Sequence, residues 1–271
     1  MALLRFTIFG ATGFIGSHLS RHLEAMGAEV FCPPRGTELA SVAGGTSLGH
    51  VVYAIGLTGD FRNRPFDTVE AHVSLLASML RQMEYESFLY LSTTRVYAGL
   101  QGPVDEETNV KLLPSRDRLY DLSKLTGEAL VLAQDNPAAR VARLSNVIGP
   151  GQSKATFIGS VVDDLQKCGR VTIGEAPESC KDYIDVADAV NLIARLAEHG
   201  SQRLYCLASG KQTTHRQIAG YLSGHGDVRF HETGAVRRFP KIRTDRIESE
   251  FGFIPKDTSE SLSRLFGQDR S

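Results

Sequence analysis

The chain has 271 residues, of which 42% are hydrophobic and 23% charged, and its formal net charge is −1. This composition is typical of a globular protein with one large or two modest domains. The near balance of charge argues against binding to nucleic acid or to a membrane surface through bulk electrostatics. The four cysteines have no paired spacing, which indicates free thiols in a reducing cytoplasm. The first apolar run is too short to span a membrane, so we expect a cytoplasmic protein without a signal peptide.

Three glycines spaced three apart follow the apolar run Leu3–Phe9 and lead into an amphipathic segment. This order is the strand–turn–helix start of a dinucleotide-binding βαβ unit. One glycine permits the tight turn, one lets the backbone approach a pyrophosphate, and one lets the helix pack closely on the strand. The pyrophosphate would rest on unpaired N–H groups at the helix N-terminus, where the macrodipole favours negative charge. The predicted cofactor contacts here are Gly10, Thr12, Gly13, Phe14, Ile15 and Gly16.

Short apolar runs then alternate with helical stretches along the first half of the chain. This alternation predicts the α/β class, with a Rossmann-type, doubly wound parallel sheet. After Asn146 the regular alternation of strands and helices ends, which predicts a smaller, mostly C-terminal substrate-binding lobe. We expect the nucleotide-binding lobe to hold residues 1–146 and about 185–208, and the substrate lobe to hold about 147–184 and 209–271. The predicted strands are Leu3–Phe9, Val30–Cys32, Val51–Ile55, Phe88–Ser92 and Val141–Ser145, and the predicted helices are one from Ile15 that ends at Gly27, then Val69–Met83, Tyr120–Gln134 and Val186–Leu196.

Tyr120 and Lys124 are four residues apart on a predicted helix, so their side chains share one face. A tyrosine ordinarily titrates near pH 10, and the cations of a lysine and a nicotinamide would favour its phenolate. Such a phenol can exchange a proton with a sugar or alcohol oxygen while a hydride moves to or from the cofactor. A Tyr-x-x-x-Lys pattern alone is more often an exposed pair on a solvated helix. Its position downstream of the glycine turn favours the functional interpretation.

Polar and small residues follow two predicted strands at their carboxyl ends, where an open α/β sheet binds its ligands. Thr93 and Thr94 close the strand Phe88–Ser92, and a hydroxyl there can hydrogen-bond a reacting oxygen. The alternative is that these hydroxyls only cap the strand end. Ala54, Ile55 and Gly56 close another strand and are predicted to contact the cofactor.

The glycine turn, the strand end through Val96-Tyr97 and the Tyr-x-x-x-Lys helix together resemble the extended short-chain dehydrogenase/reductases, the nucleotide-sugar epimerase/dehydratase family. The resemblance covers most of the chain, because Asn146–Gly151 and Lys181–Asp188 are similar to two further runs of that family. It implies an NAD(P) cofactor, a nucleotide-diphosphate sugar substrate and a homodimer through helices of the first lobe. It also implies that Thr93 is the catalytic hydroxyl, that Tyr120 is the acid/base, that Lys124 holds the ribose and tunes Tyr120, and that Thr94, Asn146 and Lys181 contact the substrate.

The sequence departs from the family pattern at three places, and these departures limit which reactions and contacts the resemblance implies. Thr94 and Arg95 stand where the family's dehydratases carry an Asp-Glu pair, and neither can replace a carboxylate, which argues against a 4,6-dehydratase. His72 replaces a helical asparagine that the family often has, which leaves open how Lys124 is linked to its surroundings. The stretch Gly36–His50 is short for the strand and the adenine-contacting acid that often lie there.

Positive charges suggest where phosphate groups bind. Arg35 follows the second strand, where NAD-preferring proteins place an aspartate, and its guanidinium suits the 2′-phosphate of NADP. An arginine stacked on adenine would serve NAD equally well, so NADP is favoured only slightly. Near the C-terminus, Arg237 and Arg243 are predicted contacts of the substrate diphosphate, although a solvated charged face would look the same. No metal site is predicted, because His215, His225 and His231 match no ligand spacing.

Three functions remain open from the sequence. The first is an NAD(P)-dependent epimerase or related oxidoreductase that acts on a nucleotide-diphosphate sugar. The second is a ketoreductase of a 4-keto-6-deoxy sugar nucleotide, which Arg35 and the compact length favour slightly. The third is a non-catalytic NAD(P)-binding sensor or RNA-associated family member. The complete set of Thr93, Tyr120 and Lys124 argues against this third interpretation, because a sensor needs no acid/base tyrosine.

Overall fold

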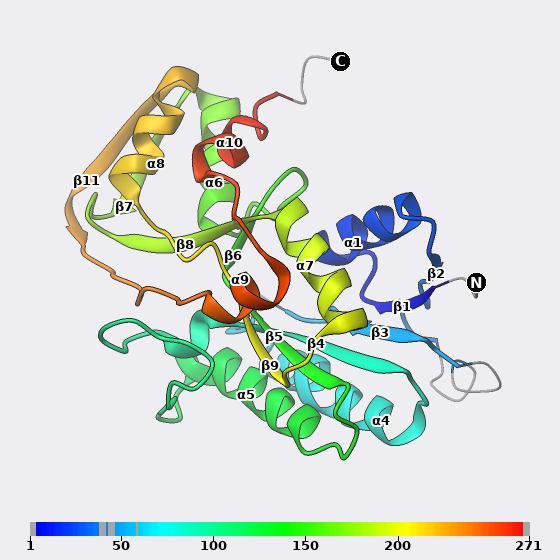
Figure 1. The fold of residues 1–271 in the computed structure, drawn as a ribbon. Helices are drawn as coiled ribbons and strands as arrows, with labels where there is room; N and C mark the ends of the chain where they lie inside the picture. The colour runs from blue at the N-terminus through cyan, green and yellow to red at the C-terminus, as the bar shows by residue number, and fades with distance from the viewer. Residues whose placement is uncertain (1–3, 38–41, 43–46, 58, 268–271) are drawn as a thin grey trace. The chain divides into compact units, whose positions relative to one another are not determined.

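A computed structural model describes residues 4–37, 42, 47–57 and 59–267 of the chain. Its largest sheet has six strands in the order β2-β1-β3-β4-β5-β9 (Figure 1). The pairings from β2 through β5 are all parallel, which confirms the predicted doubly wound α/β sheet. Its strands are β1 (Arg5–Phe9), β2 (Glu29–Phe31), β3 (His50–Tyr53), β4 (Ser87–Thr93), β5 (Ala139–Leu144) and β9 (Leu204–Leu207).

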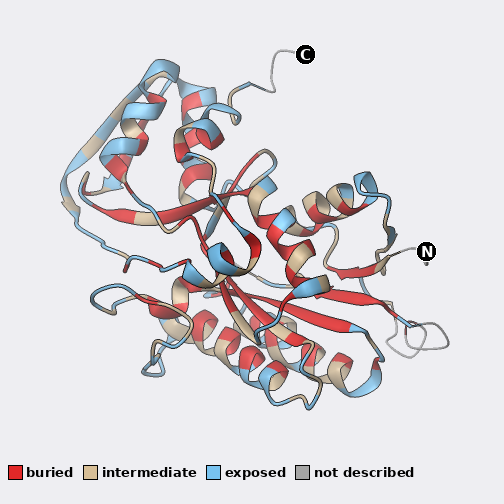
Figure 2. Ribbon diagram, viewed as in Figure 1, coloured by how far each residue is buried: buried red, intermediate tan, exposed pale blue. Residues whose placement is uncertain are grey.

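Helices cover both faces of this sheet. In Figure 1, α4 (Leu75–Gln82) and α5 (Leu119–Leu132) lie on one face, and α1 (Phe14–Ala25) and α7 (Val186–His199) lie on the other. The central strands are therefore buried from both sides, as Figure 2 shows for β3 and β4. Strands in that position are apolar along their whole length rather than alternating, which is why short apolar runs located them in the sequence. No described strand pairs with the outer edge of β2.

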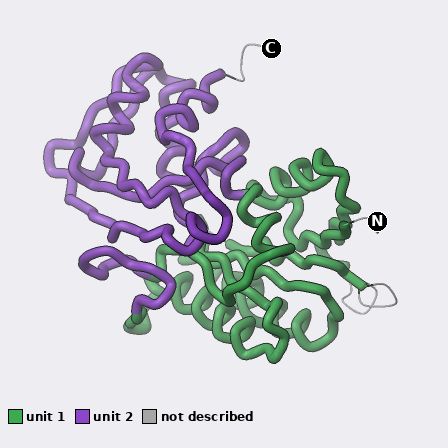
Figure 3. The backbone as a smooth tube through the Cα atoms, viewed as in Figure 1, with its two compact units in different colours: residues 1–96, 109–144, 190–205 green, residues 97–108, 145–189, 206–271 purple. Residues whose placement is uncertain are grey.

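The chain divides into two compact units (Figure 3). Unit 1 comprises residues 1–96, 109–144 and 190–205, and unit 2 comprises 97–108, 145–189 and 206–271. The segment 97–108 belongs to unit 2, a membership that the order of predicted elements does not reveal, because it rests on contacts with residues far along the chain. Within unit 2, for example, the Val104 N–H donates to the Lys241 carbonyl at 2.8 Å.

Unit 2 is built on two small sheets and the helices packed against them. The sheets have the strand orders β10-β8-β6 and β11-β7. Its core includes Ile158 and Leu165 of α6, Ile173 of β7 and Ile218 of α8, all buried. The elements are β6 (Asn146–Ile148), α6 (Phe157–Cys168), β7 (Arg170–Glu175), β8 (Cys180–Asp185), β10 (Gln212–Thr214), α8 (His215–Leu222), β11 (Asp227–Ala235), α9 (Asp245–Phe251) and α10 (Thr258–Ser263).

The helix expected at Val69–Met83 begins earlier and contains a wider turn. It starts at Pro65 as α3 (Pro65–Val69), continues through the π-helical turn η1 (Glu70–Ser74) and ends with α4. Proline is favoured at the first position of a helix, which explains the earlier start. Side chains of the sheet satisfy two backbone carbonyls of the π-helical turn, because the Tyr53 hydroxyl donates to Ala71 O at 2.6 Å and the Tyr90 hydroxyl to His72 O at 3.4 Å.

Gly10, in the turn between β1 and α1, lies very close to the backbone of Ala54. Gly10 has φ +90°, and a Cβ added there would lie 2.8 Å from the Ala54 carbonyl carbon. We expect Gly10→Ala to lower the free energy of unfolding by about 2–4 kcal/mol, because backbone strain and steric overlap add. Gly27 is the matched control, since it has φ +79° but no atom within 4 Å of an added Cβ. Gly27→Ala should cost only about 1 kcal/mol. Urea denaturation measures both, and equal losses would contradict the close approach at Gly10.

Candidate active site

The glycine turn forms an anion-binding start to α1. The Gly13 N–H donates to Gly10 O at 3.0 Å, and Gly13 occupies the N-cap position of the helix. A Cβ on Gly16 would lie 2.3 Å from Gly10 O, so the first helical turn packs directly on the strand–helix turn. The first N–H groups of a helix have no partner within it, and they attract a phosphate. This part of the chain therefore fits the pyrophosphate of a dinucleotide.

The segment Ala54–Gly56 lies beside the catalytic lysine candidate. The Ala54 N–H donates to Phe9 O at 2.8 Å, which continues the pairing of β1 with β3 past the end of β3. A Cβ added to Gly56 would lie 3.2 Å from His72 Nε2 and 3.4 Å from Lys124 Nζ. Arg35 is exposed and follows β2 by four residues, at the same edge of the sheet.

Thr93, Tyr120 and Lys124 come together in unit 1. Thr93 is the last residue of β4, and its side chain is hydrogen-bonded to the Tyr120 hydroxyl. Lys124 lies one helical turn further along α5 and donates from Nζ to Leu91 O at 2.9 Å. Tyr120 and Lys124 are only 6% and 5% exposed. A hydroxyl, a phenol and an ammonium thus lie at the carboxyl end of β4, where a parallel sheet binds its ligands.

Burial dominates the acid–base properties of this group. Burial raises the pKa of Tyr120 to about 12, while the Arg95 guanidinium and the hydrogen bond from Thr93 lower it and Asp121 raises it further. Burial also lowers the pKa of Lys124 to about 7, and the Glu128 carboxylate opposes that change. Burial therefore opposes the acidification of Tyr120 expected from Lys124, and Tyr120 is a phenol near neutral pH. In this state it can donate a proton.

A buried ion pair fixes α5 against the sheet, and the sequence analysis did not identify it. Arg143 Nη2 on β5 lies 2.6 Å from Glu128 Oε2, and both side chains are less than a tenth exposed. The Ser92 hydroxyl on β4 donates to the same carboxylate at 2.5 Å. The sequence contains one indication that Glu128 belongs to this group. Glu128 follows Lys124 by four residues and therefore lies on the same face of the helix.

His72 joins the segment after β3 to α5. Its Nε2 accepts a hydrogen bond from the Leu57 N–H at 3.3 Å, so the proton resides on Nδ1, 2.8 Å from the Ser123 hydroxyl. That hydroxyl in turn donates to Tyr120 O at 2.9 Å. Burial, with help from the Lys124 cation, lowers the pKa of His72 to about 2. The histidine that replaces the expected asparagine is therefore a neutral link between two parts of the site.

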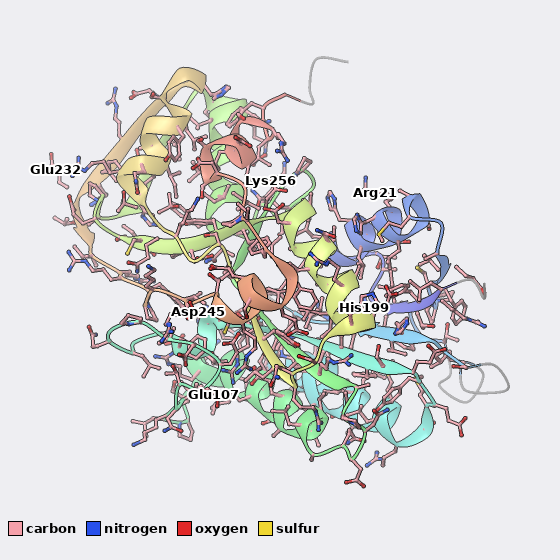
Figure 4. The ribbon with its side chains drawn as sticks, viewed as in Figure 1. Arg21, Glu107, His199, Glu232, Asp245 and Lys256 are labelled. Carbon is pink, nitrogen blue, oxygen red and sulfur yellow. The ribbon has the colours of Figure 1, made fainter. Side chains whose placement is uncertain are left out.

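The cations predicted to contact the substrate lie in two places in unit 2. Lys181 Nζ and Arg237 Nη1 lie 3.9 and 3.5 Å from the Glu175 carboxylate, which brings these two together. Arg243 instead lies 2.6 Å from Asp245, labelled in Figure 4, and lines a cavity of about 500 Å³ with Lys211 and Lys241. Asn146 donates from Nδ2 to Asp182 O at 2.8 Å. Thr94, in unit 1, is buried at 3% exposure.

Two of the three histidines considered for metal binding are packed against aromatic rings. His215 stacks on Phe157 with ring centroids 4.2 Å apart, and His225 stacks on Phe266 at 3.9 Å. Within residues 4–37, 42, 47–57 and 59–267, no three His, Cys, Asp or Glu side chains are grouped as metal ligands would be. No helix in these ranges is long and apolar enough to cross a membrane.

The chain is similar to known proteins over most of its length. A model of the NAD dependent epimerase/dehydratase family matches residues 6–208. The chain is 27% identical to the GDP-6-deoxy-D-mannose reductase of Pseudomonas aeruginosa, over 98% of this chain and 96% of that protein. It is 25% identical to a dTDP-4-dehydro-6-deoxy-D-allose reductase of a Streptomyces species, over 79% of this chain and 78% of that protein.

Two solved structures share the fold. MoeE5 in complex with UDP-glucose and NAD superposes with a TM-score of 0.82, at 20% identity and over 97% of both chains. RMD from Pseudomonas aeruginosa complexed with NADPH gives 0.79, at 23% identity and over 97% of this chain and 98% of that one. Identities this low support the fold alone.

The neutral state of His72 predicts how stability depends on pH. Burial lowers the pKa of His72 to about 2 in the folded protein, whereas the ordinary histidine pKa of about 6.5 applies when the chain unfolds. Below pH 6.5 the unfolded chain binds the extra proton, so the free energy of unfolding falls by up to about 1.4 kcal/mol per pH unit. His72→Asn should remove this contribution, and urea denaturation between pH 6.5 and 4.5 should show a shallower slope. His231→Asn, at an exposed position, is the control. Equal slopes for wild type and His72→Asn would contradict a neutral His72.

Proposed function

The chain belongs to the NAD dependent epimerase/dehydratase family, and from this premise we propose that it reduces a 4-keto-6-deoxy nucleotide-diphosphate sugar with NADPH. The observation that carries the proposal is the Tyr120 phenol, hydrogen-bonded to Thr93 and one helical turn from Lys124. Two relatives that match most of the chain are named as reductases of 6-deoxy sugar nucleotides. Their names support this substrate class for the chain.

Each part of the candidate site has a separate role in the proposed reduction. The bound nicotinamide cofactor supplies the hydride for the substrate carbonyl. The N-terminus of α1 would hold the pyrophosphate, Ala54–Gly56 would contact the cofactor, and Lys124 would bind the ribose. Thr93 orients the carbonyl oxygen through its hydroxyl, and Tyr120 donates its phenolic proton to that oxygen as charge develops there. Solvent then returns a proton to Tyr120.

The protonation state of Tyr120 fits a reduction. With its pKa raised to about 12 by burial, Tyr120 begins as an acid, which a carbonyl reduction requires. An epimerase begins by removing a proton from an alcohol and so requires the phenolate first. Arg95 argues against dehydration, because its guanidinium, held 2.8 Å from Asp121, cannot replace the carboxylate that the family's dehydratases carry at this position.

We assign the substrate diphosphate to Lys181 and Arg237 in unit 2, with Asn146 as a further substrate contact. The two cations lie within 4 Å of Glu175, and the Arg237 side chain is 74% exposed and so accessible to a ligand. A guanidinium can bind a phosphate through two parallel hydrogen bonds. Arg243 is the weaker candidate, because two of its nitrogens already contact Asp245. The role of Thr94 stays a prediction.

The decisive experiment is an assay of the full chain with 4-keto-6-deoxy nucleotide sugars and their parent sugar nucleotides. We expect oxidation of NADPH in equal amount to one reduced product, followed by absorbance and by chromatography. Tyr120→Phe should lower kcat by about 100- to 10,000-fold, because the proton donor is lost. Tyr85→Phe, on a partly buried ring that packs on Phe88, is the matched control and should keep the wild-type rate.

Other outcomes of this assay identify the alternative functions. Isomer formation without net oxidation of NADPH would indicate an epimerase. A protein that binds the cofactor but turns over no sugar nucleotide would fit the sensor or RNA-associated interpretation. Unchanged turnover by Tyr120→Phe would rule out the proposed role of the tyrosine.

Cofactor preference is tested at Arg35, which we propose binds the 2′-phosphate of NADP. Arg35→Ala should weaken NADPH binding by about tenfold or more and change NADH binding little, since NADH lacks that phosphate. Calorimetric titration of the free protein with each cofactor measures both effects. Arg21→Ala on α1, an exposed arginine labelled in Figure 4, is the matched control and should affect neither. Equal losses for NADPH and NADH at Arg35 would contradict the assignment.

A further inference from the structure

The Arg95 guanidinium lies against the catalytic tyrosine candidate, at the position where the family's dehydratases carry a carboxylate. Its central carbon is 5.7 Å from the centre of the Tyr120 ring and 5.3 Å from that of Phe61. Phe61 is 2% exposed and packs on Tyr120 with ring centroids 5.6 Å apart. Tyr120 and Phe61 are buried, whereas the Arg95 side chain is 40% exposed, so water screens part of the charge that Arg95 presents to Tyr120.

Arg95 is held in this place from two sides. Its Nε donates to Asp121 Oδ1 at 2.8 Å, and its backbone N–H donates to the Thr93 hydroxyl oxygen at 3.1 Å. Asp121 is fully buried and also accepts a hydrogen bond from Arg118 Nη1 at 3.2 Å. Two guanidinium groups therefore share one carboxylate, and the cluster keeps a net positive charge next to Tyr120.

We propose that Arg95 is a positioning residue whose fixed positive charge stabilises the Tyr120 phenolate that forms when the phenol gives up its proton. The inference rests on the proposed function, in which Tyr120 is the proton donor. In that step the phenol O–H bond breaks, the proton passes to the carbonyl oxygen as the nicotinamide reduces the carbonyl carbon, and the electron pair stays on Tyr120. A fixed cation lowers the energy of the phenolate more than that of the phenol, so it favours the transfer.

The other groups that face Tyr120 do not supply a comparable permanent charge. Asp121 on α5 is a carboxylate and opposes the phenolate. His72 on η1, whose ring centroid is 5.3 Å away, is neutral because its pKa is lowered to about 2. Burial lowers the pKa of Lys124 on α5 to about 7, so its ammonium gives up its proton more readily than a guanidinium does. Tyr90 on β4 is uncharged because burial raises its pKa. Arg95 is then the facing group that presents a guanidinium cation to Tyr120.

The test measures the titration of Tyr120 itself. The protein is labelled with 3-fluorotyrosine, and fluorine NMR follows its eight tyrosines as the pH is raised, with Tyr120→Phe identifying the resonance. Arg95→Gln removes the charge but keeps a donor for Asp121, and it should raise the pKa of Tyr120 by about one unit. Arg95→Lys should restore most of the wild-type value. Arg95→Met provides a second uncharged variant if Arg95→Gln does not fold.

Arg118 provides the matched control, because it contacts the same carboxylate from the other side. Arg118→Gln should move the Tyr120 titration by less than about half as much as Arg95→Gln. An equal shift would show that Asp121, and not Arg95, sets the charge at the tyrosine, and would overturn the proposal. So would an unchanged titration in Arg95→Gln, even if that variant lost activity.

The pH profile of the reduction gives a second readout. The basic limb of kcat/KM, where Tyr120 loses its proton, should move to higher pH in Arg95→Gln, and kcat should fall by about tenfold. A uniform loss of rate with no movement of the limb would indicate a purely structural role and overturn the proposal. The NMR titration needs neither sugar nor cofactor. Failure of turnover with every sugar nucleotide would therefore contradict the proposed function and leave the test of Arg95 intact.

Discussion

The active-site candidate depends on how α5 is fixed against β4. Glu128 on the helix forms a buried ion pair with Arg143 of β5 and accepts a hydrogen bond from Ser92 of β4. Removing one partner of such a pair leaves a buried charge without compensation, so the helix is strongly held in this register. Gly127 permits the close approach, since a Cβ there would lie 2.5 Å from the Tyr90 hydroxyl. Tyr120 and Lys124 occupy the same face of α5, which brings the phenol to the end of β4.

The π-helical turn η1 makes the second connection. Its wider turn directs His72 into the interior, while Tyr53 and Tyr90 hydroxyls satisfy two of its carbonyls. The imidazole accepts a hydrogen bond from the Leu57 backbone and contacts Ser123 on α5. The segment that follows β3 and the helix that carries Tyr120 are thereby tied together. A neutral histidine suits this place, because a charged one would face the Lys124 ammonium inside the protein.

The burial that orders Tyr120 and Lys124 also disfavours the charged forms of both side chains. It excludes water from Tyr120 and positions it next to Thr93, yet it raises the pKa of the Tyr120 phenol and lowers the pKa of Lys124. The pKa of a lysine ammonium falls readily on burial, whereas a guanidinium keeps its charge. Arg95, held by the buried Asp121, is placed where this difference matters. Arg95, which stands where the family's dehydratases carry a carboxylate, therefore suits the proposed reduction.

Local spacing in the sequence determined the α/β class and the glycine turn and singled out Tyr120 and Lys124 as candidates, because strand and helix periods and a helix N-terminus are properties of neighbouring residues. The resemblance to a family singled out Thr93. Only the tertiary structure decided the rest. Arg95 meets Asp121 across 26 residues and His72 meets Ser123 across 51, and no periodicity encodes such contacts. The same limit applies to the basic residues near the C-terminus. Folding brings Arg237 to Glu175 with Lys181 and leaves Arg243 with Asp245, because each guanidinium pairs with the carboxylate that the fold places beside it.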